Sequence, residues 1–147
     1  MICGDKLLAQ AKLPTYTRLV SRTRKVYFDS QSLRDTIILW RKLYNFRWAA
    51  VESVHASPQM GVSSSFDFGH TFGLIKGVCE GLGIAIRGVE PNLWKTRLGL
   101  SADKNKSIDR ASEIFGAEFI NEATAEAALI GWFENRRLNE LTVDVMT

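Results

Sequence analysis

The spacing of apolar residues changes several times along the 147-residue chain. Stretches rich in β-branched and aromatic residues predict strands, and stretches in which apolar residues recur every three or four positions predict helices. We expect strands at 6–12, 48–54 and 84–89, a hairpin arm at 16–28, and helices at 31–45, 66–82, 91–99, 101–115 and 121–139.

Turn and capping residues fall between these stretches. Gly4-Asp5 predicts a turn before the first strand, and Ser21-Arg22-Thr23 predicts the tip of the arm. Asp29 or Ser30 is placed to cap the following helix. The alternation of strands and helices predicts an α/β domain with helices packed on a mixed sheet.

The helix expected at 66–82 carries a glycine at every fourth position. Each glycine inside a helix costs about 0.8–1 kcal/mol relative to alanine, so that four cost roughly 3–4 kcal/mol. Close approach of another backbone would compensate this cost. We therefore expect this face to pack tightly on a sheet, a second helix or a twin subunit through Gly69, Gly73, Gly77 and Gly81.

The composition is that of a globular protein, with 46% hydrophobic and 24% charged residues. Disorder and collagen are excluded for the whole chain. No apolar run reaches the ~20 residues that span a bilayer, and the first residues do not resemble a secretory signal. Cys3 and Cys79 fit no metal-ligand spacing and favour two free thiols in a reducing compartment.

Charge is unevenly distributed along the chain. Residues 1–48 carry ten basic and three acidic residues, a net charge of +7, whereas residues 49–147 carry nine basic and thirteen acidic residues, a net charge of −4. This asymmetry predicts a surface for a polyanion beside a group of carboxylates, unless the charges are scattered over solvated faces.

Three glutamates are the strongest candidates for chemistry. Glu52 interrupts the apolar strand at 48–54, where an acid needs an arginine partner, hydrogen bonds or a metal ion. Glu122 and Glu126 are four residues apart, which places both on one helical face, either as metal ligands or as part of a solvated face. Oxygen ligands of this kind suit Mg²⁺ or Mn²⁺, and two such ions can hydrolyse a phosphodiester.

Three blocks of the chain form longer motifs: VESVHASPQMGVSSSFDFGHTFG at 51–73, GLGIAIRGVEPNLWKTRLGL at 81–100, and EATAEAALIGWF at 122–133. Together they resemble RuvC-type Holliday junction resolvases, in their phage and prophage branch. The resemblance extends over about residues 6–133. It implies an RNase H-like fold, a homodimer, and Mg²⁺-dependent cutting of four-way DNA junctions in the cytoplasm of a bacterial or phage-infected cell.

The resemblance also implies roles for individual residues. Glu52 matches the family's strand glutamate, Glu126 matches the acid of its last motif, and Glu122 stands where the family more often has aspartate. Lys104 and Lys106 lie where the family has basic residues that contact phosphates, although such lysines also occur on solvated faces.

The start of the chain departs from the family pattern, which opens with a central strand ending in a metal-bridging aspartate. This strand is missing here, and Asp5 lies too close to Leu13-Pro14-Thr15 to replace that aspartate by position. Three explanations stay open: a truncated or misassigned start, a DNA-binding protein without catalysis, or a rearranged site that uses Asp5.

The arm and the loop after it supply candidate DNA contacts. Arg18, Arg22, Arg24 and Lys25 would neutralise phosphates, and Phe66 would stack on unpaired bases. The leading hypothesis is a junction-resolving endonuclease with Glu52, Glu122 and Glu126 as metal ligands. A catalytically inactive branched-DNA-binding protein and an RNase H-like nuclease for another substrate, such as an RNA–DNA hybrid, are the alternatives.

Overall fold

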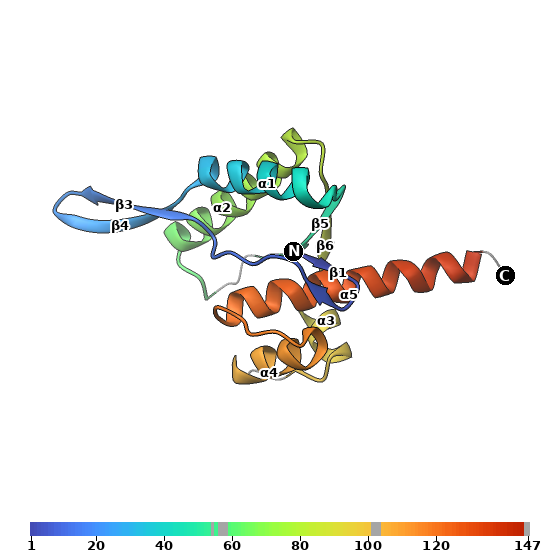
Figure 1. Ribbon diagram of the computed structural model, residues 1–147. Coiled ribbons are helices and arrows are strands. Elements are labelled where there is room, and N and C mark those ends of the chain that lie inside the picture. The colour runs from blue at the N-terminus through green and yellow to red at the C-terminus, as the bar shows by residue number, and fades with distance from the viewer. Residues whose placement is uncertain (54, 56–58, 101–103, 146–147) are drawn as a thin grey trace. The chain divides into compact units, whose positions relative to one another are not determined.

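The computed structural model describes residues 1–53, 55, 59–100 and 104–145 (Figure 1). The contacts of the chain divide it into two compact units, which are described separately. The first unit comprises Met1–Lys12, Ala50–Ser53 and Arg87–Thr147, and the second comprises Leu13–Ala49 and Val54–Ile86. That the whole chain acts as one RNase H-like domain, 1–147, stays a prediction.

The chain starts with a short hairpin in the first unit. Strand β1, Ile2–Cys3, pairs antiparallel with β2, Lys6–Leu7, around Gly4, whose φ of 55° is left-handed. The expected turn is confirmed, but the strand predicted at 6–12 ends at Leu7. Beyond the two paired positions, the Leu8 N–H donates a hydrogen bond to the Met1 carbonyl.

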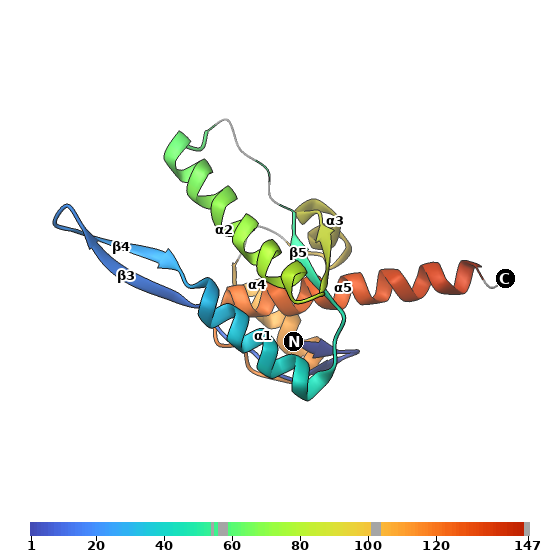
Figure 2. The same ribbon diagram turned by 90° about the horizontal axis from the view of Figure 1, so that it is seen from above.

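The arm of the second unit is confirmed. Strands β3, Thr15–Val20, and β4, Thr23–Phe28, form an antiparallel hairpin whose turn is Ser21-Arg22. Both turn residues have positive φ angles, 49° and 67°, which match the twist of a two-residue hairpin. The arm extends away from the next helix in both views (Figures 1 and 2).

Two helices build the rest of the second unit. Helix α1, Ser30–Tyr44, begins at the expected cap, where Asp29 accepts a hydrogen bond from the Ser32 N–H. Helix α2, Val62–Gly81, begins four residues earlier than predicted, because the Ser65 N–H already closes a turn on the Gly61 carbonyl. Their small core contains Ile37, Cys79 and Ile84, with Leu33, Val78 and Leu82 packed against it.

The tight packing predicted for the glycines of α2 is wrong for this chain. A methyl group at any of the four glycines would meet no atom of the described residues within 4 Å. The neighbouring Val78, Cys79 and Leu82 supply the core contacts of the helix instead. Contact of the glycine face with a twin subunit stays a prediction.

Strands β5, Trp48–Glu52, and β6, Ala85–Val89, form a third pair. The Ala85 N–H bonds to the Arg47 carbonyl and the Ser53 N–H to the Val89 carbonyl, so the two strands run in the same direction. The predicted continuous mixed sheet is not formed by the described residues, which contain three separate two-stranded sheets. The β3–β4 pair leaves most of its side chains exposed.

Three helices complete the first unit: α3, Pro91–Arg97, α4, Lys104–Phe115, and α5, Glu122–Val145. Trp94, Ala125 and Leu129 are fully buried at the centre of their core. Helix α5 continues past the predicted end at 139, where residues 140–145 contain neither glycine nor proline. Ser101, the predicted cap of α4, lies outside the described residues.

Two further expectations concern the cysteines and membrane-spanning helices. Cys3 is an exposed free thiol and Cys79 is a buried one. Among the described helices, none combines the length and the hydropathy that crossing a membrane requires.

Candidate active site

Glu52 is fixed by a buried tryptophan. It ends β5, is half-buried, and its Oε1 accepts a 3.0 Å hydrogen bond from Nε1 of Trp94. The parallel pairing of β5 with β6 brings these residues together, because the Ser53 N–H bonds to Val89 just before α3 begins. The acid in the apolar strand is therefore partnered by a hydrogen bond from an indole N–H, one of the three solutions expected from the sequence.

Glu126 is held from two other helices. Its Oε1 lies 3.3 Å from Nζ of Lys95 on α3 and accepts a 3.2 Å hydrogen bond from Oγ of Ser107 on α4. The ammonium group of Lys95 also lies 5.1 Å from the centre of the Trp94 ring. Consecutive residues of α3 thus hold the two carboxylates, one from β5 and one from α5.

Sequence reasoning missed Lys95 and Ser107 as site residues. Both Trp94 and Lys95 lie in a block that resembles the resolvase family, and that block was the signal that could have found them. Ser107 follows Lys106 directly and carries no pattern of its own.

Glu122 lies one helical turn before Glu126, in the first turn of α5. The helix starts there because Asn121 and Thr124 cap it reciprocally: the Thr124 N–H donates to Oδ1 of Asn121, and the Asn121 N–H donates to Oγ1 of Thr124. A carboxylate in the first turn also interacts favourably with the helix dipole. The half-buried Glu122 is therefore firmly positioned on the helix.

The donor chemistry of the glutamates suits Mg²⁺ or Mn²⁺, which prefer carboxylate oxygens. In the described part of the chain, however, no three acidic, histidine or cysteine side chains lie close enough to share a metal ion. Lys95 supplies the positive charge beside Glu126 in this arrangement. Metal binding by Glu52, Glu122 and Glu126 together stays a prediction.

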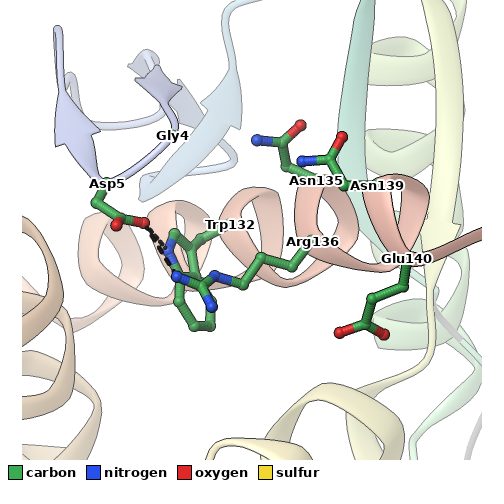
Figure 3. A pocket seen from close by; sticks show the side chains of 7 residues that line it. All are labelled: Gly4, Asp5, Trp132, Asn135, Arg136, Asn139 and Glu140. Atoms are coloured by element: carbon green, nitrogen blue, oxygen red, sulfur yellow. Dashed lines mark hydrogen bonds and ion pairs between the residues drawn. The ribbon is translucent and has the colours of Figure 1, made fainter. Parts of the chain in front are cut away.

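Asp5 is engaged elsewhere on α5. Its Oδ1 accepts a 2.6 Å hydrogen bond from Nε1 of Trp132 and lies 3.6 Å from a guanidinium nitrogen of Arg136 (Figure 3). The Arg136 guanidinium in turn covers the Trp132 ring at 4.3 Å. These side chains border a hollow of about 330 Å³ that Asn135 and Asn139 also line. The contacts give Asp5 a structural role at the base of the β1–β2 turn.

A buried acid anchors α5 farther along. Glu134, with only 1% of its side chain exposed, accepts two hydrogen bonds from Arg137, at 2.8 and 2.9 Å, and lies 3.6 Å from Arg87 of β6. The hydrogen bonds to Glu134 and its charge raise the pKa of the Arg137 guanidinium. This cluster ties α5 to the strand that leads into α3, and nothing in the local sequence pattern predicted it.

The other predicted contact residues are placed as follows. Lys106 is exposed on α4, while Lys104 begins that helix and its side chain lies outside the described part. Arg22, Arg24 and Lys25 are exposed on the arm. Phe66 is 71% exposed on α2 and stacks on His70, with ring centres 6.2 Å apart.

Comparison with known proteins gives a fold but no family. No protein-family model matches the chain, and no curated protein matches it. Solved structures of Thermus thermophilus RuvC do match. RuvC in complex with a Holliday junction substrate matches with a TM-score of 0.54 at 12% sequence identity. Another RuvC structure matches with a TM-score of 0.54 at 13% sequence identity. Each match covers 80% of this chain and 82% of the RuvC chain.

The chain therefore has a RuvC-like fold of mixed α/β type, which agrees with the predicted RNase H-like class. Identities of 12% and 13% show the fold alone. The phage branch and the missing first strand stay predictions.

Proposed function

We propose that this protein is a structure-selective endonuclease that resolves four-way DNA junctions in the cytoplasm of a bacterial or phage-infected cell. One observation carries the proposal: within a RuvC-like fold, Trp94 and Lys95 gather the carboxylates of Glu52 and Glu126 from separate elements. The similarity to RuvC in complex with a Holliday junction substrate supports the choice of DNA substrate.

The residues of the cluster have distinct parts in this proposal. Trp94 fixes one oxygen of Glu52 and so orients the other, and Ser107 does the same for Glu126. Lys95 balances the charge of Glu126 and offers an ammonium group to a phosphate. Glu52, Glu126 and Glu122 would hold Mg²⁺ or Mn²⁺, which when bound lowers the pKa of a water and stabilises the leaving oxygen.

Binding of the junction would use basic and aromatic side chains. Arg22, Arg24 and Lys25 of the arm are exposed, and Lys106 is exposed on α4, so each can neutralise a phosphate. Lys104 joins this set by its position in the sequence. Phe66 is exposed enough to stack on an unpaired base. We propose a homodimer, because two-fold symmetry places two sites on opposed strands.

The decisive experiment compares Glu52→Gln with the unaltered protein on a synthetic four-way junction, in Mg²⁺ and in Mn²⁺. We expect the variant to lose cleavage but to keep its affinity in a gel-shift assay, because the amide keeps the shape of the side chain and removes its charge. Glu113→Gln is the matched control, since Glu113 is exposed on α4 and forms a surface ion pair with Arg110. Equal cleavage by the Glu52 variant would remove Glu52 from the mechanism.

A second candidate is a junction-binding protein that does not cut. The contact of Lys95 with Glu126 favours it, because an ammonium group then occupies a place where a divalent ion would bind. The same experiment separates the two functions. Tight binding of the junction without cleavage by the unaltered protein, in either metal, would select the binding function.

A further inference from the structure

The register of the arm sorts its side chains onto two faces. Arg18 lies directly opposite Lys25, and Tyr16 lies directly opposite Tyr27. Since side chains alternate along a strand, these four residues share one face, which we call the tyrosine–arginine face. The opposite face carries Leu19 opposite Arg24 and Thr17 opposite Val26.

The tyrosine–arginine face contains an unfavourable pair. Like charges directly opposite one another in an antiparallel pair repel, because their Cβ atoms are only about 4.5–5.5 Å apart. Arg18 and Lys25 are exposed, and the sequence from 15 to 28 contains no acidic residue that could neutralise them. An anion seated between the two side chains would turn this repulsion into two attractive contacts.

The two tyrosines add hydrogen-bond donors beside these charges. Their rings stack with centres 5.5 Å apart and planes inclined by 22°, while 49% of Tyr16 and 36% of Tyr27 remains exposed. Stacking holds the rings in place, and each phenol can donate a hydrogen bond to an anion. The face thus presents two cations and two hydroxyl donors together.

The opposite face is chemically different. Leu19 and Val26 are 67% and 68% exposed, and Arg24 is the single charge opposite Leu19. Apolar side chains neither neutralise a phosphate nor donate hydrogen bonds to it. The two faces of the arm are therefore unlike, although both carry basic residues.

We propose that the tyrosine–arginine face of the arm is the surface that binds the sugar-phosphate backbone of DNA, with one phosphate shared by Arg18 and Lys25. This inference rests on the proposed function and deepens it, because it makes Arg18 and Lys25 the principal phosphate contact of the arm and gives Arg22 and Arg24 a lesser part. The face contacts phosphate and hence positions the DNA without reading its sequence.

The test compares two double variants that remove equal charge from the same arm: Arg18→Gln with Lys25→Gln, and Arg22→Gln with Arg24→Gln. Affinity for a fluorescent four-way junction is measured by anisotropy over a range of KCl concentrations. Each lost phosphate contact lowers the slope of log K against log salt by about 0.9. Because Arg18 and Lys25 share one phosphate, we expect the first double variant to reduce the magnitude of the slope by about 0.9 and the second to change it by less than half as much.

The controls separate charge from folding. Arg18→Lys with Lys25→Arg keeps both charges and should keep the slope. Arg18→Gln with Lys25→Gln removes a repulsion, so its thermal midpoint should equal or exceed that of the unaltered protein. A lower midpoint together with weaker binding would attribute the effect to a damaged arm and overturn the proposal.

The remaining outcomes distinguish the inference from the function on which it rests. If the unaltered protein binds no DNA, the proposed function fails and the inference with it. If it binds the junction and both double variants weaken binding equally, or neither does, DNA binding stands and the assignment to one face is overturned. A parallel experiment measures the binding of the same variants to vesicles of phosphatidylserine and phosphatidylcholine. If replacing Arg18 and Lys25 weakens binding to vesicles but not to DNA, the proposal is also overturned.

Discussion

The indole nitrogen of Trp94 lies 3.0 Å from Oε1 of Glu52 and donates a hydrogen bond to it. Trp94 has no exposed surface, so this bond joins the centre of the core to a carboxylate of the candidate site. The position of Glu52 therefore depends on how α3 packs, and a substitution in the core should displace the Glu52 carboxylate in the candidate site.

Replacing Trp94 with phenylalanine should weaken both the fold and the site. The change removes the donor and leaves a half-buried carboxylate oxygen without its partner, which costs about 1–3 kcal/mol. Urea denaturation measures this loss of unfolding free energy, and junction cleavage should fall with it. Trp40→Phe is the control, since Trp40 is half-buried on α1. Unchanged stability in the Trp94 variant would contradict the role of the hydrogen bond.

Lys95→Gln should affect activity far more than stability. Ion pairs with this much exposure contribute about 0–1 kcal/mol, and 38% of the Lys95 side chain is exposed. Loss of a positive group beside the reacting phosphate should lower the cleavage rate by about 10²-fold. Lys76→Gln, which removes an exposed pair with Glu80, should leave cleavage unchanged. A Lys95 variant that cuts at the normal rate would refute a part for Lys95 in cleavage.

Glu134→Ala should lower the free energy of unfolding more than the replacement of an exposed charged residue does. It leaves Arg87 and Arg137 without their buried partner, which costs about 3 kcal/mol, at the lower end of the range for breaking a buried pair because both arginines reach solvent. Glu140→Ala removes an exposed pair with Arg97 and should cost less than 1 kcal/mol, about the value of a surface ion pair. Chemical denaturation of both variants compares these costs, and equal values would contradict the anchoring of α5 by Glu134.

The cap of α1 should make stability depend on pH in the acid range. Hydrogen bonds from the Ser32 backbone and side chain lower the pKa of Asp29 below its usual value of 3.8. Because the folded pKa is the lower one, the stabilisation is complete above the unfolded pKa and is lost as the pH falls through the folded pKa. Below about pH 4, the thermal midpoint of the unaltered protein should fall toward that of Asp29→Asn.

The matched control for the cap is Asp35→Asn. Asp35 is exposed on the same helix and forms a surface ion pair with Arg34. Its removal should leave the shape of the pH profile unchanged. A profile of Asp29→Asn that runs parallel to that of the unaltered protein would show that the cap does not titrate in this range.

Local signals were sufficient to predict elements with defined ends. The arm and α1 followed from β-propensity, a turn at 21–23 and a cap at Asp29 or Ser30, each of which depends on neighbours in sequence. The separation of the strands into three pairs could not be predicted, because the partner of a strand such as β5 is set by a distant part of the chain.

The candidate site shows the same division. Glu52 was noticed because an acid in an apolar strand is unusual, but its partner Trp94 belongs to another element and looks like any core aromatic in the sequence. Lys95 is one of many basic residues, and only the folded chain shows that it meets Glu126. Pairings of this kind have no local pattern and emerge only from tertiary packing.

Neither compact unit is a continuous stretch of polypeptide. The backbone leaves the first unit after Lys12, returns for Ala50–Ser53, leaves again, and returns at Arg87. No single cut can therefore release either unit as one unbroken fragment. Unfolding of one unit would free the ends of the segments that form the other. The two units should therefore unfold together in one cooperative step.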